Sequence, residues 1–162
     1  MPSTYEKIST TTLGASTSSV TLSSIPATYT DLVLIVNGKM VSGENSLGIR
    51  FNGDSGSNYS ANVIYGDGTS AQALRFNNGN EIYSARMGSP TNSTSIFYIF
   101  NYSNTTTNKS IMSRGGSNGI IMVTAGMWQS TAAINSIFVR GFGAFSDFAS
   151  GCTFTLYGIK AA

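Results

Sequence analysis

Apolar and polar residues alternate with a period of two along much of this chain, and helical periodicity is hard to find. Successive residues of a strand point to opposite faces of a sheet, so this alternation is typical of half-buried β-strands. The segments that follow it are residues 20–24, 31–37, 47–52, 59–65, 81–87, 95–102, 109–113, 119–127, 134–140 and 153–160. Ten short strands at this spacing predict an all-β fold, an antiparallel β-sandwich.

Clusters rich in glycine and asparagine separate these segments, at 66–68, 77–80, 115–119 and 141–143. Such residues tolerate positive φ and are typical of the turns between strands. The length of 162 residues suits one domain. We therefore expect a single β-sandwich domain over residues 13–162, preceded by a short N-terminal extension or arm at 1–12.

Two of the predicted strands are apolar at both sets of alternating positions. The segment 32–36 reads Leu-Val-Leu-Ile-Val, which favours a central strand covered on both faces. In the segment 96–102, Phe97 and Ile99 alternate with other apolar residues, several of them aromatic. One face of that strand belongs in the core, and the other would expose a row of rings that a soluble monomer seldom shows. This pattern favours an oligomer interface.

Ionisable side chains are sparse: 9 Lys and Arg, 7 Asp and Glu, and no His. Charged residues make up 10% of the chain, against a usual share of about 25%. The carboxylates are Glu6, Asp31, Glu44, Asp54, Asp67, Glu81 and Asp147, most of them in predicted loops. They offer no convincing pair for acid–base chemistry. We expect no catalytic residues and no enzyme activity.

The uncharged polar surface instead favours contacts with other proteins, because hydroxyl and amide groups lose their water more cheaply than ions do. A formal net charge of +2, spread over dispersed lysines and arginines, is too small for a nucleic-acid-binding stripe. No run approaches the ~18 apolar residues of a membrane span, and the polar start lacks the apolar core of a signal peptide. We expect neither nucleic acid nor membrane as a partner, and synthesis in a cytoplasm.

Three local features have competing interpretations. Asn52, Asp54, Ser57 and Asn58 place oxygen donors in one loop, but a single Asp is poor for calcium, so we expect no metal and no cofactor. Trp128, the one Trp, either stacks on a ligand or fills the core with its N–H on a backbone carbonyl, and the core is favoured. The one cysteine, Cys152, has no partner for a disulfide and is expected to be a small packing residue.

Arginines in or near strands of a charge-poor protein either form forked bonds to a neighbouring chain or simply lie on solvated strand faces. The residues expected at an interface are Tyr5, Ile8, Phe97, Ile99 and Arg114.

Three stretches carry a resemblance: 28–34 with the following Asn37-Gly38, then 49–59, and the closing Phe-Thr-Leu-Tyr-Gly-Ile-Lys-Ala-Ala at 154–162. Together they resemble virion proteins of tailed bacteriophages, especially those of marine and cyanobacterial phages. The similarity spans nearly the whole chain, and its closing segment is the most specific part. It implies a jelly-roll-like β-sandwich that acts as a capsid decoration (cement) protein or as a domain of a tail fibre.

The resemblance also implies a homotrimer at three-fold positions of the capsid, and it supplies no catalytic residues. A fibre normally needs an attachment region and a repetitive shaft, whereas here the domain starts near Met1, so decoration is favoured over the tail-fibre or receptor-binding alternative. The expected partner is the major capsid protein and the expected location is the capsid surface of the virion. Residues 2–12 would add a strand to a neighbour's sheet edge.

Overall fold

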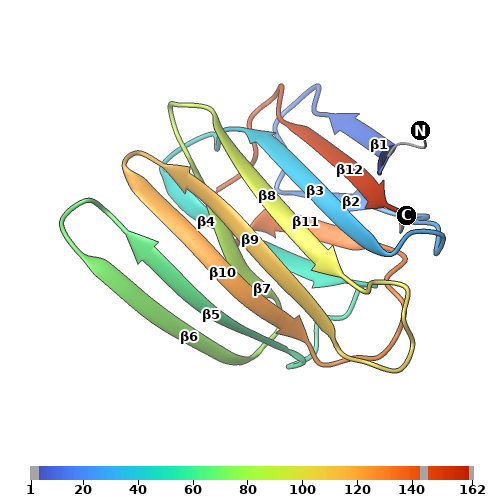
Figure 1. Ribbon diagram of the computed structural model, residues 1–162. Coiled ribbons are helices and arrows are strands. Elements are labelled where there is room, and N and C mark those ends of the chain that lie inside the picture. Colours follow the sequence, from blue (N-terminus) through green and yellow to red (C-terminus); the bar gives the residue numbers. More distant parts are fainter. Residues whose placement is uncertain (1–3, 143–145, 161–162) are drawn as a thin grey trace.

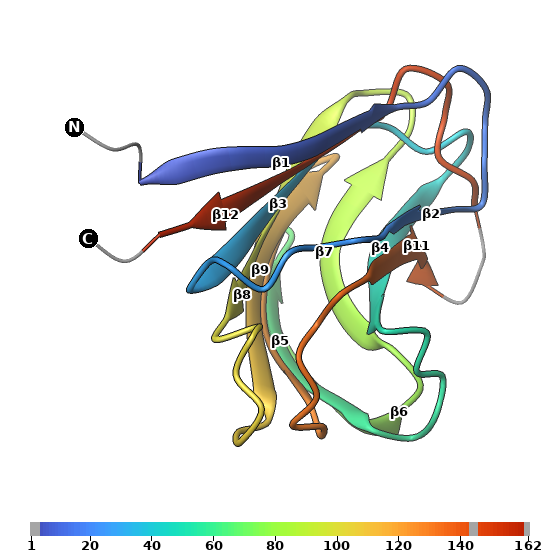
Figure 2. The same ribbon diagram turned by 90° about the vertical axis from the view of Figure 1, so that its right-hand side faces the viewer.

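The computed structural model describes residues 4–142 and 146–160. In this part the chain forms two antiparallel sheets and confirms the predicted all-β, jelly-roll-like β-sandwich. The large sheet has the strand order β1-β12-β3-β8-β9-β10-β5-β6, and the small sheet has the order β2-β11-β4-β7 (Figure 1). Figure 2 shows the two sheets as separate layers.

The strands of the large sheet are β1 Tyr5–Thr12, β3 Asp31–Gly38, β5 Tyr59–Gly66, β6 Ala71–Gly79, β8 Ser93–Phe100, β9 Lys109–Ser117, β10 Ile120–Trp128 and β12 Thr153–Ile159. Those of the small sheet are β2 Ser19–Leu22, β4 Glu44–Phe51, β7 Ile82–Gly88 and β11 Ile137–Gly141. Each segment predicted from alternation overlaps one of these strands.

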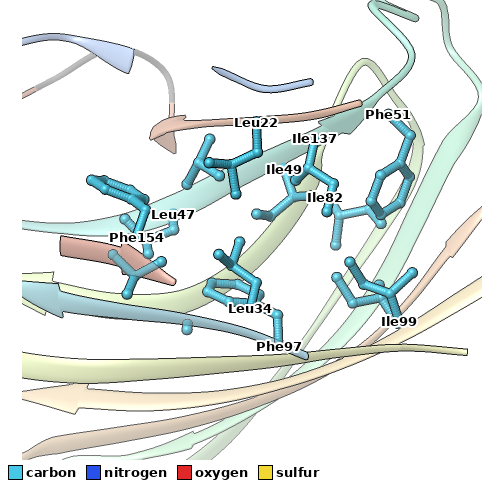
Figure 3. Packing of buried hydrophobic residues seen from close by; sticks show 14 of the residues in the cluster. Leu22, Leu34, Leu47, Ile49, Phe51, Ile82, Phe97, Ile99, Ile137 and Phe154 are labelled. Atoms are coloured by element: carbon cyan, nitrogen blue, oxygen red, sulfur yellow. The ribbon is translucent and has the colours of Figure 1, made fainter. Parts of the chain in front are cut away.

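The core lies between the two sheets, where alternate residues of facing strands meet (Figure 3). The large sheet contributes Leu34, Phe97, Ile99 and Phe154, and the small sheet contributes Leu22, Leu47, Ile49, Phe51, Ile82 and Ile137. Most of these side chains are fully removed from water. At about 25 cal/mol per Å² of apolar surface buried, such a layer is the main stabilising term of the fold.

Two strands were not predicted. Strand β6 is exposed over nearly its whole length on both faces, so its sequence has no buried set of alternate residues to reveal it. Strand β1 was expected to be an arm that pairs with a neighbour. Instead, Tyr5–Thr12 pairs antiparallel with β12 and forms an edge of the large sheet. The expectation of a free arm was therefore wrong for Tyr5–Thr12, because the edge of β12 lies within reach of the same chain.

Candidate interaction surface

The outward residues of β8, β9, β10 and β5 form one continuous face of the large sheet. Register shows this directly, since side chains paired across antiparallel strands lie on the same face. Ile96 is paired with Arg114, Arg114 with Val123, and Val123 with Ile64. Figure 1 looks onto this face, which points away from the small sheet.

Much of this surface is apolar and open to water. We call this side of β8, β9, β10 and β5 the outer face. Its exposed apolar side chains are Ile64, Phe100, Met112, Ile121, Val123 and Met127. The most exposed are Ile121 at 70% and Ile64 at 65%. Half-buried Ile96 and Tyr98 continue the patch toward β3. Contiguous apolar surface of this kind marks sites of interaction with proteins or membranes.

The outward face of the small sheet has a different character. There the carboxylate of Glu81 accepts two hydrogen bonds from Arg140, at 2.8 and 3.1 Å, and pairs with Arg50 at 3.4 Å. Gly48 makes room for this group, because a Cβ at that position would stand 2.6 Å from Glu81 Oε2. The guanidinium of Arg50 also lies over the ring of Phe138. The outward side of the small sheet thus carries charges that neutralise one another, whereas the outward side of the large sheet carries apolar side chains.

Arg114 lies exposed within the outer face and has no ion-pair partner among the described residues. On β8, β9, β10 and β5, all within the described part, the outward positions hold no carboxylate. The face is therefore apolar with uncompensated positive charge.

The structure separates the residues that were expected at an interface. Arg114 is on the outer face, and Tyr5 is 51% exposed on the edge strand β1. Ile8 is half-buried against the core. The assignment of Phe97 and Ile99 was wrong, because both are fully buried between the sheets. Apolar residues at both sets of alternate positions indicate that a strand has two apolar faces, but this pattern does not indicate which face meets the core.

Sequence reasoning missed most of the outer face, although β10 carries the signal. Ile120, Ile121, Met122 and Val123 are apolar at both sets of alternate positions. The same feature pointed to interface surface in the segment 96–102. Applied to 119–127, it would have placed Ile121 and Val123 at an interface.

Two of the four residues considered for calcium, Asn52 and Asp54, have their side-chain oxygens engaged within the protein. Asp54 accepts hydrogen bonds from the Gly56 amide, the Asn58 side chain and the indole of Trp128. Asn52 Oδ1 accepts from the amides of Asn135 and Ser136. The bond from Trp128, more than the others, lowers the pKa of Asp54 below its ordinary value. In the described part of the chain, no cluster of three or more His, Cys, Asp or Glu residues is placed to hold a metal ion.

Trp128 is buried, as predicted, but its partner differs from the expected backbone carbonyl. Its Nε1 donates to a carboxylate, Oδ2 of Asp54, at 2.7 Å. Cys152 is also a buried packing residue, as predicted: its thiol donates to the carbonyl of Lys39, and burial raises its pKa. Across the described ranges, no helix has the length and apolar character needed to span a membrane.

Two hollows lie where the outer face meets the loops at one end of the large sheet. The first, of about 350 Å³, is lined mainly by hydroxyl and amide side chains, among them Asn37, Asn92, Thr94 and Ser150, together with Lys39. The second, of about 450 Å³, shares Asn92, Ser93 and Thr94 with it and reaches Ile121.

No protein-family model matches the chain, and no curated protein matches it. Among solved structures, it is similar to galectin LEC-6 of Caenorhabditis elegans, with 10% identity over 91% of this chain and 94% of that one and a TM-score of 0.39. It is also similar to the alginate lyase Aly36B, with 7% identity over 90% of this chain and 78% of that one and a TM-score of 0.33. Likenesses this distant carry no argument about ligand, substrate or partner.

Proposed function

We propose that this protein is a structural protein of a phage virion, a capsid decoration protein that attaches over junctions of the major capsid protein. The observation that supports this most is the outer face. Its apolar side chains span four adjacent strands and remain exposed in the single chain. A binder that covers such a surface only in the assembled state stabilises that state by mass action.

A purely structural role also agrees with the environment of the ionisable groups. Glu81 is held by arginines, and Asp54 accepts hydrogen bonds from its own loop and from Trp128. Asp67 accepts from the backbone amides of Thr69 and Ser70, which lowers its pKa to about 2. Carboxylates fixed in these ways serve packing and turns, so we propose no enzymatic activity.

The proposed assembly is a homotrimer on the capsid surface, consistent with the closed cyclic symmetry of most oligomers. The sequence resemblance described above supports both the virion location and this symmetry.

The copy number in purified virions tests the proposal. A decoration protein occurs once or more for each capsid junction, on the order of hundreds of copies per particle, because capsid symmetry repeats its site. Quantified bands of purified particles measure this number against the major capsid protein. A few copies per particle, or none, would contradict a role in decoration.

A second candidate is a tail-fibre or receptor-binding module, which the hollow at Lys39 favours. Hydroxyl and amide side chains such as Asn37, Thr94 and Ser150 suit hydrogen bonding to sugar hydroxyls. This candidate predicts binding of host glycans at that hollow and a low copy number, so the same quantification separates the two roles.

A further inference from the structure

The outer face has a polar hollow at its β6 margin, of about 300 Å³, between β10, β5 and β6. Its lining includes Ser60, Asn62, Arg75, Asn77, Ala125 and Met127. Register places Asn62 between Ala125 and Arg75, so these three side chains lie on the same side of the sheet as the outer face. We propose that this hollow binds a carboxylate side chain of the protein that docks on the outer face. This proposal rests on the proposed function, because it takes the group that enters the hollow to belong to a protein partner.

The hollow is rich in hydrogen-bond donors. Arg75 Nε donates to Asn77 Oδ1 at 3.1 Å, which orients the guanidinium. The amide nitrogen of Asn77 remains available to donate a hydrogen bond to a ligand. The terminal nitrogens of Arg75, and the side chains of Ser60 and Asn62, have no hydrogen-bond partner within the described residues. No carboxylate lines the site. A guanidinium fork beside amide donors matches the two oxygens of a carboxylate.

The walls indicate what carries that carboxylate. Ala125 and Met127 form the β10 side of the hollow, and Met127 belongs to the exposed apolar face. A group that enters the hollow therefore continues directly into apolar contacts. An Asp or Glu side chain on an otherwise apolar protein surface fits both the hydrogen-bond donors of the hollow and the apolar side chains beside it.

Charge argues against a second copy docked through the same face. Arg114 lies three strand spacings and two residues away from Arg75, about 16 Å. A second copy would bring further arginines, and the outward positions of these four strands offer no carboxylate in return. An acidic and apolar partner surface would instead neutralise both arginines, and complementary charge of this kind sets register and specificity.

The test uses the full chain, labelled with ¹⁵N, and a random copolymer of glutamate and tyrosine as the probe. We expect the side-chain signals of Arg75, Asn62 and Asn77 to shift on addition of this copolymer. Arg75→Glu should weaken binding about tenfold or more, because a charge-assisted pair becomes a repulsive one. Arg75→Lys should retain part of the affinity, since it keeps the charge and loses the fork.

The matched control is Lys7→Glu, which makes the same change in net charge at an exposed residue of β1, the opposite edge of the large sheet, and should leave binding nearly unchanged. A lysine–tyrosine copolymer should not bind. The inference is overturned if Lys7→Glu weakens binding as much as Arg75→Glu, or if the signals of the hollow do not move. Equal binding of polygalacturonate, which carries carboxylates on a sugar backbone, would also overturn the assignment to a protein partner.

Capsid attachment is measured separately, so the two ideas can fail independently. If the acidic copolymer binds at Arg75 but capsids take up no protein, the virion role fails and the carboxylate site stands. If capsids take up wild type and Arg75→Glu equally well, the carboxylate site fails and the virion role stands.

Discussion

Trp128 donates a hydrogen bond from Nε1 to Oδ2 of Asp54 at 2.7 Å, joining the end of β10 to the loop between β4 and β5. The indole also stacks on Tyr59 at 6.3 Å and contacts Phe51 at 5.6 Å between ring centroids. One carboxylate therefore fixes both its own turn and an aromatic cluster of the core.

Because of this contact, the free energy of unfolding should decrease as the pH falls. The pKa of Asp54 is lower in the folded chain than its ordinary value, so the stabilisation is fully present above about pH 4 and is lost as pH falls through the folded pKa. The free energy of unfolding should fall on acidification, and the difference between wild type and Asp54→Asn should shrink. Fluorescence of the one Trp follows unfolding at the site itself. A difference between the two proteins that stays constant as pH falls would contradict this account.

Glu81 is the buried partner of two arginines, and its side chain is 2% exposed. Glu81→Gln should destabilise the protein by about 3 kcal/mol, because removing one member of a buried pair leaves uncompensated charge. The matched control is Glu44→Gln: the side chain of Glu44 is 22% exposed where it pairs with Arg86, so this variant should cost about 1 kcal/mol or less. Urea unfolding gives both values. Equal costs for the two variants would show that burial does not set the strength of these pairs.

Gly158 supports the ring of Tyr29, which lies directly over its backbone. A Cβ at this position would stand 2.2 Å from Tyr29 Cγ. The ring cannot easily move aside, because its hydroxyl donates to Glu6 and the backbone amide of Tyr29 donates to Tyr102. Gly158→Ala should therefore destabilise the chain by about 1–3 kcal/mol.

The control for this prediction is Gly14→Ala, where a Cβ would have no atom within 4 Å. It should be neutral or slightly stabilising. Thermal unfolding of the two variants decides the matter, and a loss at Gly14 as large as that at Gly158 would contradict the packing argument.

The sequence predicted the fold better than the surface, for reasons visible in single residues. The period-two alternation of β5 and β12 reveals strands because it is a local pattern. It could not tell Phe97 from Ile96, since both faces of β8 are apolar and only the position of the small sheet decides which is buried. The partner of Trp128 lies 74 residues away, and no local pattern reports such a contact.

The edges of the large sheet show the same limit. Tyr5–Thr12 has the polar composition of an arm, yet it finds the edge of β12 and pairs there. Strand β6 pairs with β5 alone, and apart from Phe76, which stacks on Tyr83, its side chains are exposed, so its residues carry no alternating burial pattern.

We propose that the outer face is the surface that attaches to the capsid. Co-sedimentation with purified capsids tests it, using Val123→Asp on the outer face and Thr21→Asp on the exposed side of the small sheet as its match. Both substitutions are at exposed positions, so both variants should fold. We predict that Val123→Asp lowers capsid occupancy about tenfold or more while Thr21→Asp binds like wild type. Undiminished occupancy with Val123→Asp, or equal loss in both variants, would contradict the account.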